Sequence, residues 1–243
     1  MDANKKIQTI EQISLVRKIL LQSLALIFLF FMVFFLLSDQ VYQFIAQPLL
    51  AKLPIESKMI ATNITTPLLV PIKLSFYSAL FVTTPFILFL CWRFIAPGLY
   101  QNEKRLLWLS LLVTAFLFYL GVLFCYFLIL PLVFNFLISM VPSYITLLPD
   151  MSHYLSFSLK LMFAFGLVFE TPLAIVLLTT STIVGIEKLR AWRPYFIVGA
   201  FVIGMLLTPP DVISQICLAI PLWILYEIGL ISSHWVLRKI IKE

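Results

Sequence analysis

Leu20–Leu37 reads LLQSLALIFLFFMVFFLL, a run in which only Gln22 and Ser23 are polar. A helix needs about 20 mostly apolar residues to cross the roughly 30 Å hydrocarbon core of a bilayer, so this run predicts a transmembrane helix. Five further apolar runs follow it, at Ile72–Trp92, Leu106–Leu130, Leu155–Val184, Tyr195–Leu207 and Val212–Ser232. The sequence therefore predicts an all-α polytopic membrane protein with six transmembrane helices in a single domain, 1–243.

The composition supports this class. Hydrophobic residues make up 62% of the 243 residues and charged residues 12%, and the mean hydropathy is +1.07. Soluble proteins carry about 25% charged residues, so this chain has too few charged residues to cover a water-exposed surface. Three cysteines without a CxxC pair and two histidines leave zinc and redox motifs without ligands. No phosphate-binding loop or hydrolase motif is present either, so we expect no cofactor, no metal and no enzyme activity.

The net charge of +6 reflects membrane orientation in our interpretation, and not nucleic-acid binding. Thirteen of the seventeen Lys and Arg residues lie before the first run or after the second, fourth and sixth. The other four are Lys52, Lys58, Lys73 and Lys160. Loops on the cytoplasmic side collect Lys and Arg. We therefore predict a multi-pass membrane protein with both termini in the cytoplasm.

The fifth run is too short for an average bilayer. Its thirteen residues, Tyr195–Leu207, span only about 20 Å as a helix. The turn that follows is also short, and Asp211 is placed to cap the sixth helix. We predict a shallow hairpin that thins the bilayer beside it. Near its tip, Thr208 and Gln215 favour docking of another transmembrane helix, because a polar side chain in lipid seeks a hydrogen-bond partner.

Three charged residues fall inside the predicted spans, where charges are costly and often functional. Glu170 precedes Thr171-Pro172, and the proline predicts a locally polar, kinked helix. Glu170 either lines a hydrated pocket, forms an ion pair such as one with Lys160, or stays neutral through burial. Lys160 alternatively extends its amine to the outer surface. Glu227 lies near the cytoplasmic end of the sixth span, within reach of the interface.

Several stretches resemble the TatC family of the twin-arginine protein translocase. The most specific are Phe94–Arg105 (FIAPGLYQNEKR), Phe163–Pro172 (FAFGLVFETP) and Arg193–Glu227, which contains VGAFVIGMLLTPPDVISQ and LAIP. Met59–Lys73 (MIATNITTPLLVPIK) and Tyr154–Phe157 (YLSF) extend the resemblance to nearly the whole chain.

The resemblance implies a concave six-helix bundle that binds twin-arginine signal peptides and helps folded proteins cross the membrane under the proton-motive force. It implies a hetero-oligomer of several copies with single-span TatA-like and TatB-like subunits, in contact with membrane lipid. The signal-peptide site it implies comprises Glu103 with Glu11, Arg17, Lys18, Pro97 and Arg105. Glu170 and Glu227 would be the intramembrane polar residues, and Met205, Thr208, Asp211 and Gln215 would dock the partner helix.

The resemblance also divides the segments outside the spans. Before the first span, Ile7, Ile10 and Ile13 repeat every three residues, which by itself predicts a short cytoplasmic interfacial helix at 1–19 that enters this span. The resemblance implies an outer cap of short helices at 38–71, which includes Pro48. The first cytoplasmic loop would occupy 93–105 and carry Glu103, whose carboxylate suits bidentate bonds from a guanidinium. Judged without the resemblance, Glu103 is an ordinary solvated loop charge.

Two positions depart from the family pattern. The family carries a carboxylate before the first span where this chain has Leu15, and often a Gln where this chain has Leu90. Either Glu11 takes the missing carboxylate's place, since i and i+4 share a helix face, or Glu103 acts alone. The alternative functions are a small proton-coupled secondary transporter and a lipid-modifying enzyme. The first lacks the expected internal repeat, and the second lacks a polar catalytic cluster.

Overall fold

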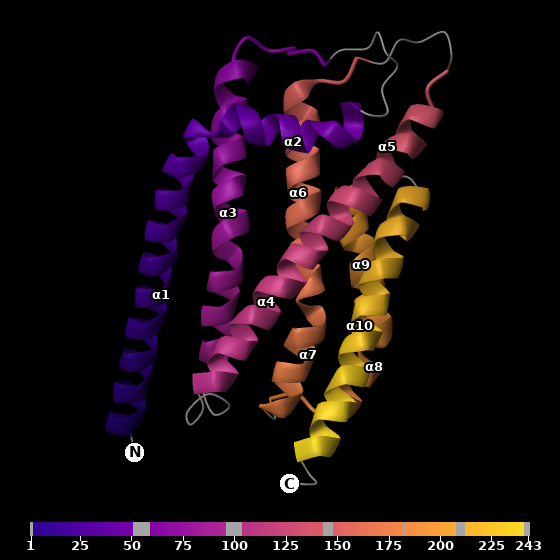
Figure 1. Cartoon of the computed structure of the whole chain (residues 1–243). Helices are drawn as coiled ribbons and strands as arrows, with labels where there is room; N and C mark the ends of the chain where they lie inside the picture. Colours follow the sequence, from indigo (N-terminus) through magenta and orange to yellow (C-terminus); the bar gives the residue numbers. More distant parts are fainter. Residues whose placement is uncertain are drawn as a thin grey trace.

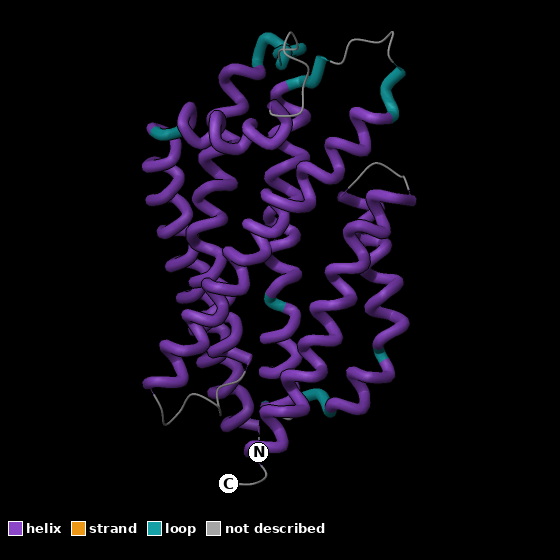
Figure 2. Tube along the Cα trace, turned by 45° about the vertical axis from the view of Figure 1, so that its right-hand side comes forward, coloured by secondary structure: helices purple, strands orange, loops and turns teal. Residues whose placement is uncertain are grey.

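The computed structural model describes residues 2–50, 59–95, 104–142, 148–181, 183–207 and 212–240. This part of the chain is nearly all helical, and its one β-bridge is the isolated pair Ile60 and Asp150 (Figure 2). The helices are α1 Asp2–Leu36, α2 Ser38–Leu50, α3 Thr66–Ile95, α4 Lys104–Phe124, η2 Cys125–Ile129, α5 Leu130–Ser139, α6 Met151–Phe169, α7 Thr171–Thr180, α8 Ile186–Ala191, α9 Arg193–Leu207 and α10 Val212–Ile240.

The predicted helical membrane fold is confirmed. Five helical segments of the described chain are long and apolar enough to span a membrane: Arg17–Leu36, Thr66–Trp92, Leu109–Ser139, Met151–Thr180 and Gln215–Val236. The remaining apolar helix is α9, with only 15 residues, or about 22 Å. The end of α9 and the start of α10, which face each other across the hairpin turn, lie below the level of α2 in both views (Figures 1 and 2). This arrangement agrees with the predicted shallow hairpin.

The long helices run roughly side by side, and both termini lie at one end of the molecule (Figure 1). The packed pairs are α1 with α3, α4 with α6, and α10 with α7 and α9. The second helix, α2, lies crosswise over the opposite end of the bundle (Figure 1). We call these the terminal end and the outer end below.

Close contact between α4 and α6 depends on two glycines. A Cβ atom on Gly121 would lie 2.6 Å from the Phe165 carbonyl oxygen, and one on Gly166 would lie 2.6 Å from the Phe118 ring. Phe118 and Phe165 are both buried. In lipid, helices associate through van der Waals packing, which small residues at the interface permit. These glycines therefore set the distance between the two helices.

The third span differs from the prediction at its end. The predicted run ends at Leu130, but the helix continues through Pro131 as α5 to Ser139. The five residues before α5 form the π-helical segment η2, Cys125–Ile129. A proline lacks an N–H and crowds the carbonyl four residues earlier. The wider π turn accommodates this misfit, and the helix passes through it.

Hydrogen bonds of three side chains, those of Tyr126, Tyr154 and Asp150, connect the outer cap to the bundle. Tyr126 and Tyr154 donate hydrogen bonds of 2.7 Å to the α2 carbonyl oxygens of Phe44 and Ile45. Asp150 caps α6 by accepting from the backbone N–H groups of Ser152 and His153, each at 2.9 Å. The same carboxylate accepts from the Thr62 backbone at 3.0 Å and hydroxyl at 2.6 Å. The segment before α3 is thus tied to the start of α6.

Two predicted segment boundaries need correction. Residues 66–71, which were assigned to the outer cap 38–71, form the first turns of α3. Among the described residues of that range, α2 is the one cap helix, and Pro48 lies inside it, partly buried. The N-terminal segment 1–19 does not end as a helix of its own, because α1 runs without a break from Asp2 into the first span, and the interfacial position of this segment stays a prediction. Helix propensity and a missing breaker allow this continuation.

Candidate functional site: an unpartnered carboxyl, a clamped hairpin and a basic end

Glu170 occupies the break between α6 and α7. Pro172 lies in the first turn of α7 and cannot donate to the carbonyl of the preceding turn. At this turn the Glu170 N–H donates to the Leu167 carbonyl three residues earlier, at 3.1 Å. The Glu170 carbonyl accepts from the Ala174 N–H four residues later, at 2.9 Å. The helix is therefore interrupted just before Pro172, between α6 and α7, and this interruption places a carboxyl side chain at the turn.

The Glu170 side chain is buried without a partner. It is 3% exposed, and neither carboxyl oxygen makes a hydrogen bond in the described structure. The indole N–H of Trp92, near the end of α3, faces the carboxyl group, but the two groups do not reach hydrogen-bond geometry. Burying unsatisfied polar groups is costly. This pair of unpartnered groups from distant parts of the sequence is thus a candidate site for a hydrogen-bonding ligand.

The suggested ion pair between Lys160 and Glu170 is wrong. Lys160 is exposed on α6, and the one ion pair among the described residues joins Arg193 to Glu227. Ten residues separate Lys160 from Glu170, so the helix places them nearly three turns apart. The alternative interpretation, in which Lys160 reaches the surface, agrees with its exposure.

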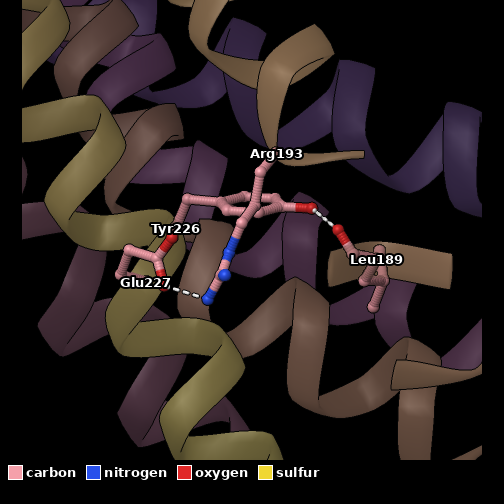
Figure 3. A network of polar contacts seen from close by, with 4 residues as sticks. All are labelled: Leu189, Arg193, Tyr226 and Glu227. Carbon is pink, nitrogen blue, oxygen red and sulfur yellow. Dashed lines mark hydrogen bonds and ion pairs between the residues drawn. The ribbon is translucent and has the colours of Figure 1, made fainter. Parts of the chain in front are cut away.

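Glu227 has a structural partner that sequence reasoning missed. Its carboxylate accepts from the Arg193 guanidinium at 2.7 Å, which joins α10 to the first residue of α9 (Figure 3). Next to this pair, Tyr226 stacks on Phe196 with ring centroids 4.2 Å apart. The Tyr226 hydroxyl donates to the Leu189 carbonyl of α8 at 2.6 Å (Figure 3). These residues clamp α8, α9 and α10 together at the terminal end.

The clamp was detectable in principle. Arg193 and Pro194 directly precede the fifth span, and Tyr226 and Glu227 lie near the end of the sixth. Because the two helices are antiparallel, these pairs lie at the same depth. The prediction treated Glu227 together with Glu170 as intramembrane polar residues. The structure gives the two carboxylates different surroundings, since Glu170 is unpartnered and Glu227 is paired and partly exposed.

The outer half of the hairpin presents an apolar groove. A Cβ on Gly204 would lie 3.6 Å from the Gln215 Cα atom, so the two helices approach closely there. Met205 is exposed at 60%, whereas Thr208 and Asp211 lie outside the described residues. Farther down, α9 and α10 flank a groove of about 290 Å³. Its lining is Ile197, Phe201, Ala219, Ile220 and Trp223.

Of the predicted signal-peptide residues, Arg17 and Lys18 are the ones whose side chains the structure describes. Arg17 and Lys18 are exposed on α1. Glu11 belongs to α1 and Arg105 to the first turn of α4, with only their backbones described. Pro97 and Glu103 lie between α3 and α4, outside the described residues. The terminal ends of α3 and α4 lie close together (Figure 1), and α1 packs on α3.

Comparison with known proteins identifies the family. Residues 11–221 match the family described as "Sec-independent protein translocase protein (TatC)". The chain belongs to the TatC family. It is 47% identical to the TatC protein of Haemophilus influenzae over 219 residues, covering 90% of this chain and 86% of the relative. It is 44% identical to that of Escherichia coli K12 over 223 residues, covering 92% and 86%.

A solved structure supports the TatC fold as well. The crystal structure of a twin-arginine translocase receptor TatC superposes with a TM-score of 0.82 at 36% identity, covering 92% of this chain and 98% of that one. The expected family and translocase function are therefore confirmed, and the chain is a multi-pass membrane protein of a transport system and not an enzyme. The secondary-transporter alternative receives no support. Among the described residues no cluster of three His, Cys, Asp or Glu could hold a metal ion.

Proposed function

We propose that this TatC family member is the signal-peptide receptor of its translocase and that it binds the arginine pair at the terminal end. The observation that carries this proposal is the retained FIAPGLYQNEKR loop with Glu103, anchored between the adjacent ends of α3 and α4. A carboxylate accepts two parallel bonds from a guanidinium. Arg17, Lys18, Pro97 and Arg105 surround this carboxylate in the proposed site.

Glu11 supplies the second carboxylate of the proposed site in place of the one missing at Leu15. The two positions are four residues apart on the continuous helix α1, so they share one face. Moving the carboxylate by one turn shifts it by about 6 Å along the axis. The flexible arginine side chains of a signal peptide can span this difference.

Separate alanine variants test this site. Glu103→Ala should abolish both cross-linking of a twin-arginine signal peptide and export of a folded reporter. Glu11→Ala should weaken both at least tenfold, because the second guanidinium loses its partner. Glu187→Ala, an exposed acid on α8, is the matched control and should leave both unchanged. If Glu11→Ala behaves like this control while Glu103→Ala is inactive, Glu103 acts alone.

The receptor lies in the bacterial inner membrane with its terminal end in the cytoplasm, according to this proposal. The two termini share one end of the molecule (Figure 1), and thirteen of seventeen Lys and Arg residues belong to segments of that end. Such an excess marks the cytoplasmic side. A cysteine at Gly185, an open position after α7, should react with an impermeant maleimide only after the cells are permeabilised.

The α9–α10 hairpin docks single-span TatA-like and TatB-like partners in a complex of several copies. Supporting features are the apolar groove between the two helices and the exposed Met205 above it. Thr208, Asp211 and Gln215 provide the polar contacts at the tip. A double variant of Thr208→Leu and Gln215→Leu should reduce partner co-purification strongly. Gln22→Leu, an exposed polar residue in α1, should not change it.

Transport draws on the proton-motive force, since the sequence carries no phosphate-binding loop for nucleotide hydrolysis. Glu170 belongs to the concave face that receives the substrate, and its unpartnered carboxyl offers that face hydrogen-bonding capacity. Collapse of the proton gradient by an ionophore should stop export of the reporter while ATP levels are held constant. Continued export under these conditions would contradict this part of the proposal.

A further inference from the structure

Three aromatic rings mark the place where α3, α4 and α6 meet. Phe81 of α3, Phe118 of α4 and Phe163 of α6 contact one another, with ring centroids 6.4, 6.0 and 6.3 Å apart in the three pairs. A Cβ atom on Gly166 of α6 would lie 2.6 Å from the Phe118 ring. These contacts show which turns of the three helices lie at the same level.

Thr114 and Glu170 lie at about the same level, one turn from these rings toward the terminal end. Helix α4 runs away from the terminal end, and α6 runs toward it (Figure 1). Thr114 precedes Phe118 by four residues, and Glu170 follows Gly166 by four. Residues four apart share one helix face, so both side chains belong to the contact between α4 and α6. Thr114 is fully buried there.

Trp92 reaches the same place from α3. It follows Phe81 by eleven residues, or about three helical turns, so the two side chains share one face of α3. A long side chain on a helix points back toward the start of that helix, which for α3 is the outer end (Figure 1). The indole is therefore directed toward the level of Glu170, and its N–H faces the Glu170 carboxyl group.

The polar atoms of these three residues match one another in number. Trp92 Nε1, Thr114 Oγ1 and both carboxyl oxygens of Glu170 are buried and make no hydrogen bond in the described part of the chain. The indole N–H and the hydroxyl are donors, and the two carboxylate oxygens are acceptors. We call Trp92, Thr114 and Glu170 the polar triad.

The Thr114 hydroxyl differs from those of other threonines in the spans. A threonine within a helix can donate to the carbonyl of the preceding turn. Four threonines do so at 2.7–2.9 Å: Thr83, Thr84, Thr179 and Thr180. Thr114 makes no such bond, so its hydroxyl proton is available to an acceptor outside its own helix.

We propose that the polar triad links the signal-peptide site to the break between α6 and α7. In the receptor with bound signal peptide, the Trp92 N–H donates to one Glu170 oxygen and the Thr114 hydroxyl donates to the other. Helices α3 and α4 precede and follow the segment that carries Glu103, so a peptide held by Glu103 restrains both helices. Trp92 and Thr114 are thus positioning residues, and this inference rests on the proposed signal-peptide site.

The two bonds and peptide binding support each other in this proposal. Neither bond is formed in the described structure, so the ends of α3 and α4 have to move slightly toward α6 to form them. A ligand that binds better to the arrangement with both bonds shifts the protein toward it. By the same linkage, loss of either donor weakens binding of the peptide.

Signal-peptide affinity of the full chain in detergent tests this link. The probe is a fluorescently labelled twin-arginine signal peptide that contains no tryptophan. Trp92→Phe keeps an aromatic ring without the N–H, and Thr114→Val keeps the shape without the hydroxyl. Each should weaken binding about two- to tenfold, the effect of one lost hydrogen bond. Glu170→Leu should weaken it by about the product of both, and adding Trp92→Phe to Glu170→Leu should cause no further loss.

Trp235→Phe and Ser158→Ala are the matched controls. Trp235 is an exposed tryptophan of α10. Ser158 is a buried serine of α6 whose hydroxyl also makes no hydrogen bond in the described structure, but it lies about three turns from Glu170. Both variants should bind the peptide like the parent chain. A loss of affinity in Ser158→Ala equal to that in Thr114→Val would show that the effect is not specific to the triad, and it would overturn the proposal.

The fluorescence of Trp92 gives a second measurement with the triad intact. The other four tryptophans are replaced by phenylalanine: Trp108, Trp192, Trp223 and Trp235. Unlabelled signal peptide should change the Trp92 emission, because its N–H gains a carboxylate as acceptor. Glu170→Leu in the same background should abolish this change at peptide concentrations that saturate binding. A purely structural role of Trp92 would leave the emission the same with and without peptide.

The outcomes separate this inference from the receptor function on which it rests. If the parent chain binds the peptide but the losses from Trp92→Phe and Glu170→Leu multiply, the triad is not coupled and the proposal is overturned, while the receptor function stands. Unchanged Trp92 emission at saturating peptide leads to the same conclusion. If the parent chain binds no signal peptide, the proposed function fails and the inference fails with it.

Discussion

At the scale of single residues, Glu170 is the least expected feature of the bundle. It is buried and unpartnered next to the indole N–H of Trp92. A charged side chain in the membrane interior is costly, and such residues are usually functional. A structural carboxyl at this depth would be expected to have its hydrogen bonds satisfied within the protein. We therefore expect Glu170 to contribute more to binding than to stability, which substitutions at this position can test.

Two substitutions separate these roles. Glu170→Gln keeps the shape and the hydrogen-bonding capacity, so export should stay close to that of the parent chain. Glu170→Leu removes two unsatisfied acceptors, each worth about 1–3 kcal/mol when buried, so the unfolding temperature in detergent should stay equal or rise while export falls. Scanning fluorimetry and a folded export reporter measure the two effects. A fall in unfolding temperature for Glu170→Leu with normal export would make the residue structural.

Glycine substitutions test the α4–α6 contact. Gly121→Ala would place a methyl group 2.6 Å from the Phe165 carbonyl oxygen, and backbone atoms cannot move aside as side chains do. Overpacking of this kind costs about 1–3 kcal/mol, so we expect a lower unfolding temperature. Gly199→Ala in α9 meets nothing within 4 Å and should be neutral or slightly stabilising. Equal stability of the two variants in detergent would show that these glycines do not set the helix spacing.

At the scale of elements, local sequence predicted most of the helices because a membrane span leaves a strong hydropathy signal. The interruption before Pro172 and the short α9 also followed from local rules. The continuation of the third span past Pro131 did not, since a π turn over Cys125–Ile129 depends on how the helix packs. The crosswise placement of α2 depends on Tyr126 and Tyr154, which lie far away in the sequence.

The same limit applies to the candidate site. The sequence singled out Glu170 because a carboxylate in an apolar run is visible without a structure. It did not supply the indole of Trp92 as a neighbour, because that contact joins helices separated by 78 positions. It also left Glu227 without its partner Arg193. Pairings between distant helices are decided by packing, which a single sequence does not encode locally.

Asp150 connects the outer segment before α3 to α6, and its effect should depend on pH. The hydrogen bonds from Thr62, followed by those from the α6 backbone, hold the pKa of this carboxyl well below its usual value of about 3.9. The ionised form is therefore favoured in the folded state. Its contribution to stability is present above about pH 4 and is lost as the pH falls through the lowered pKa.

Asp150→Asn tests this linkage. Asn keeps the helix cap but carries no charge, so the variant should be less stable than the parent at pH 7. The difference in unfolding temperature should narrow as the pH falls from 7 to 3. Thr62→Val removes the 2.6 Å hydroxyl bond and should reduce the effect of the Asp150→Asn substitution when the two are combined. A difference that stays constant with pH would show that the charge of Asp150 does not stabilise the fold.

At the scale of the whole molecule, helices of unequal length must share one bilayer. Helix α9 has 15 residues, while the span that includes α4 and α5 has 31. At about 1.5 Å per residue, α9 reaches about 22 Å against a hydrocarbon core of roughly 30 Å. We therefore expect the bilayer next to the hairpin to thin, at a cost of a fraction of a kcal/mol per Å of mismatch.

Bilayer thickness should consequently control how exposed the hairpin tip is to water. We expect Val212→Cys, at the exposed start of α10, to react with a water-soluble maleimide in vesicles of 14-carbon lipids and to react much more slowly in 20-carbon lipids. Met140→Cys, an exposed position just after α5 at the outer end, should react at similar rates in both, because α5 extends beyond the hairpin (Figure 1). The three native cysteines are replaced by serine or alanine beforehand. If the rate at position 212 is independent of lipid length, the hairpin does not lie below the normal membrane surface, and partner docking at its tip must be explained without a thinned bilayer.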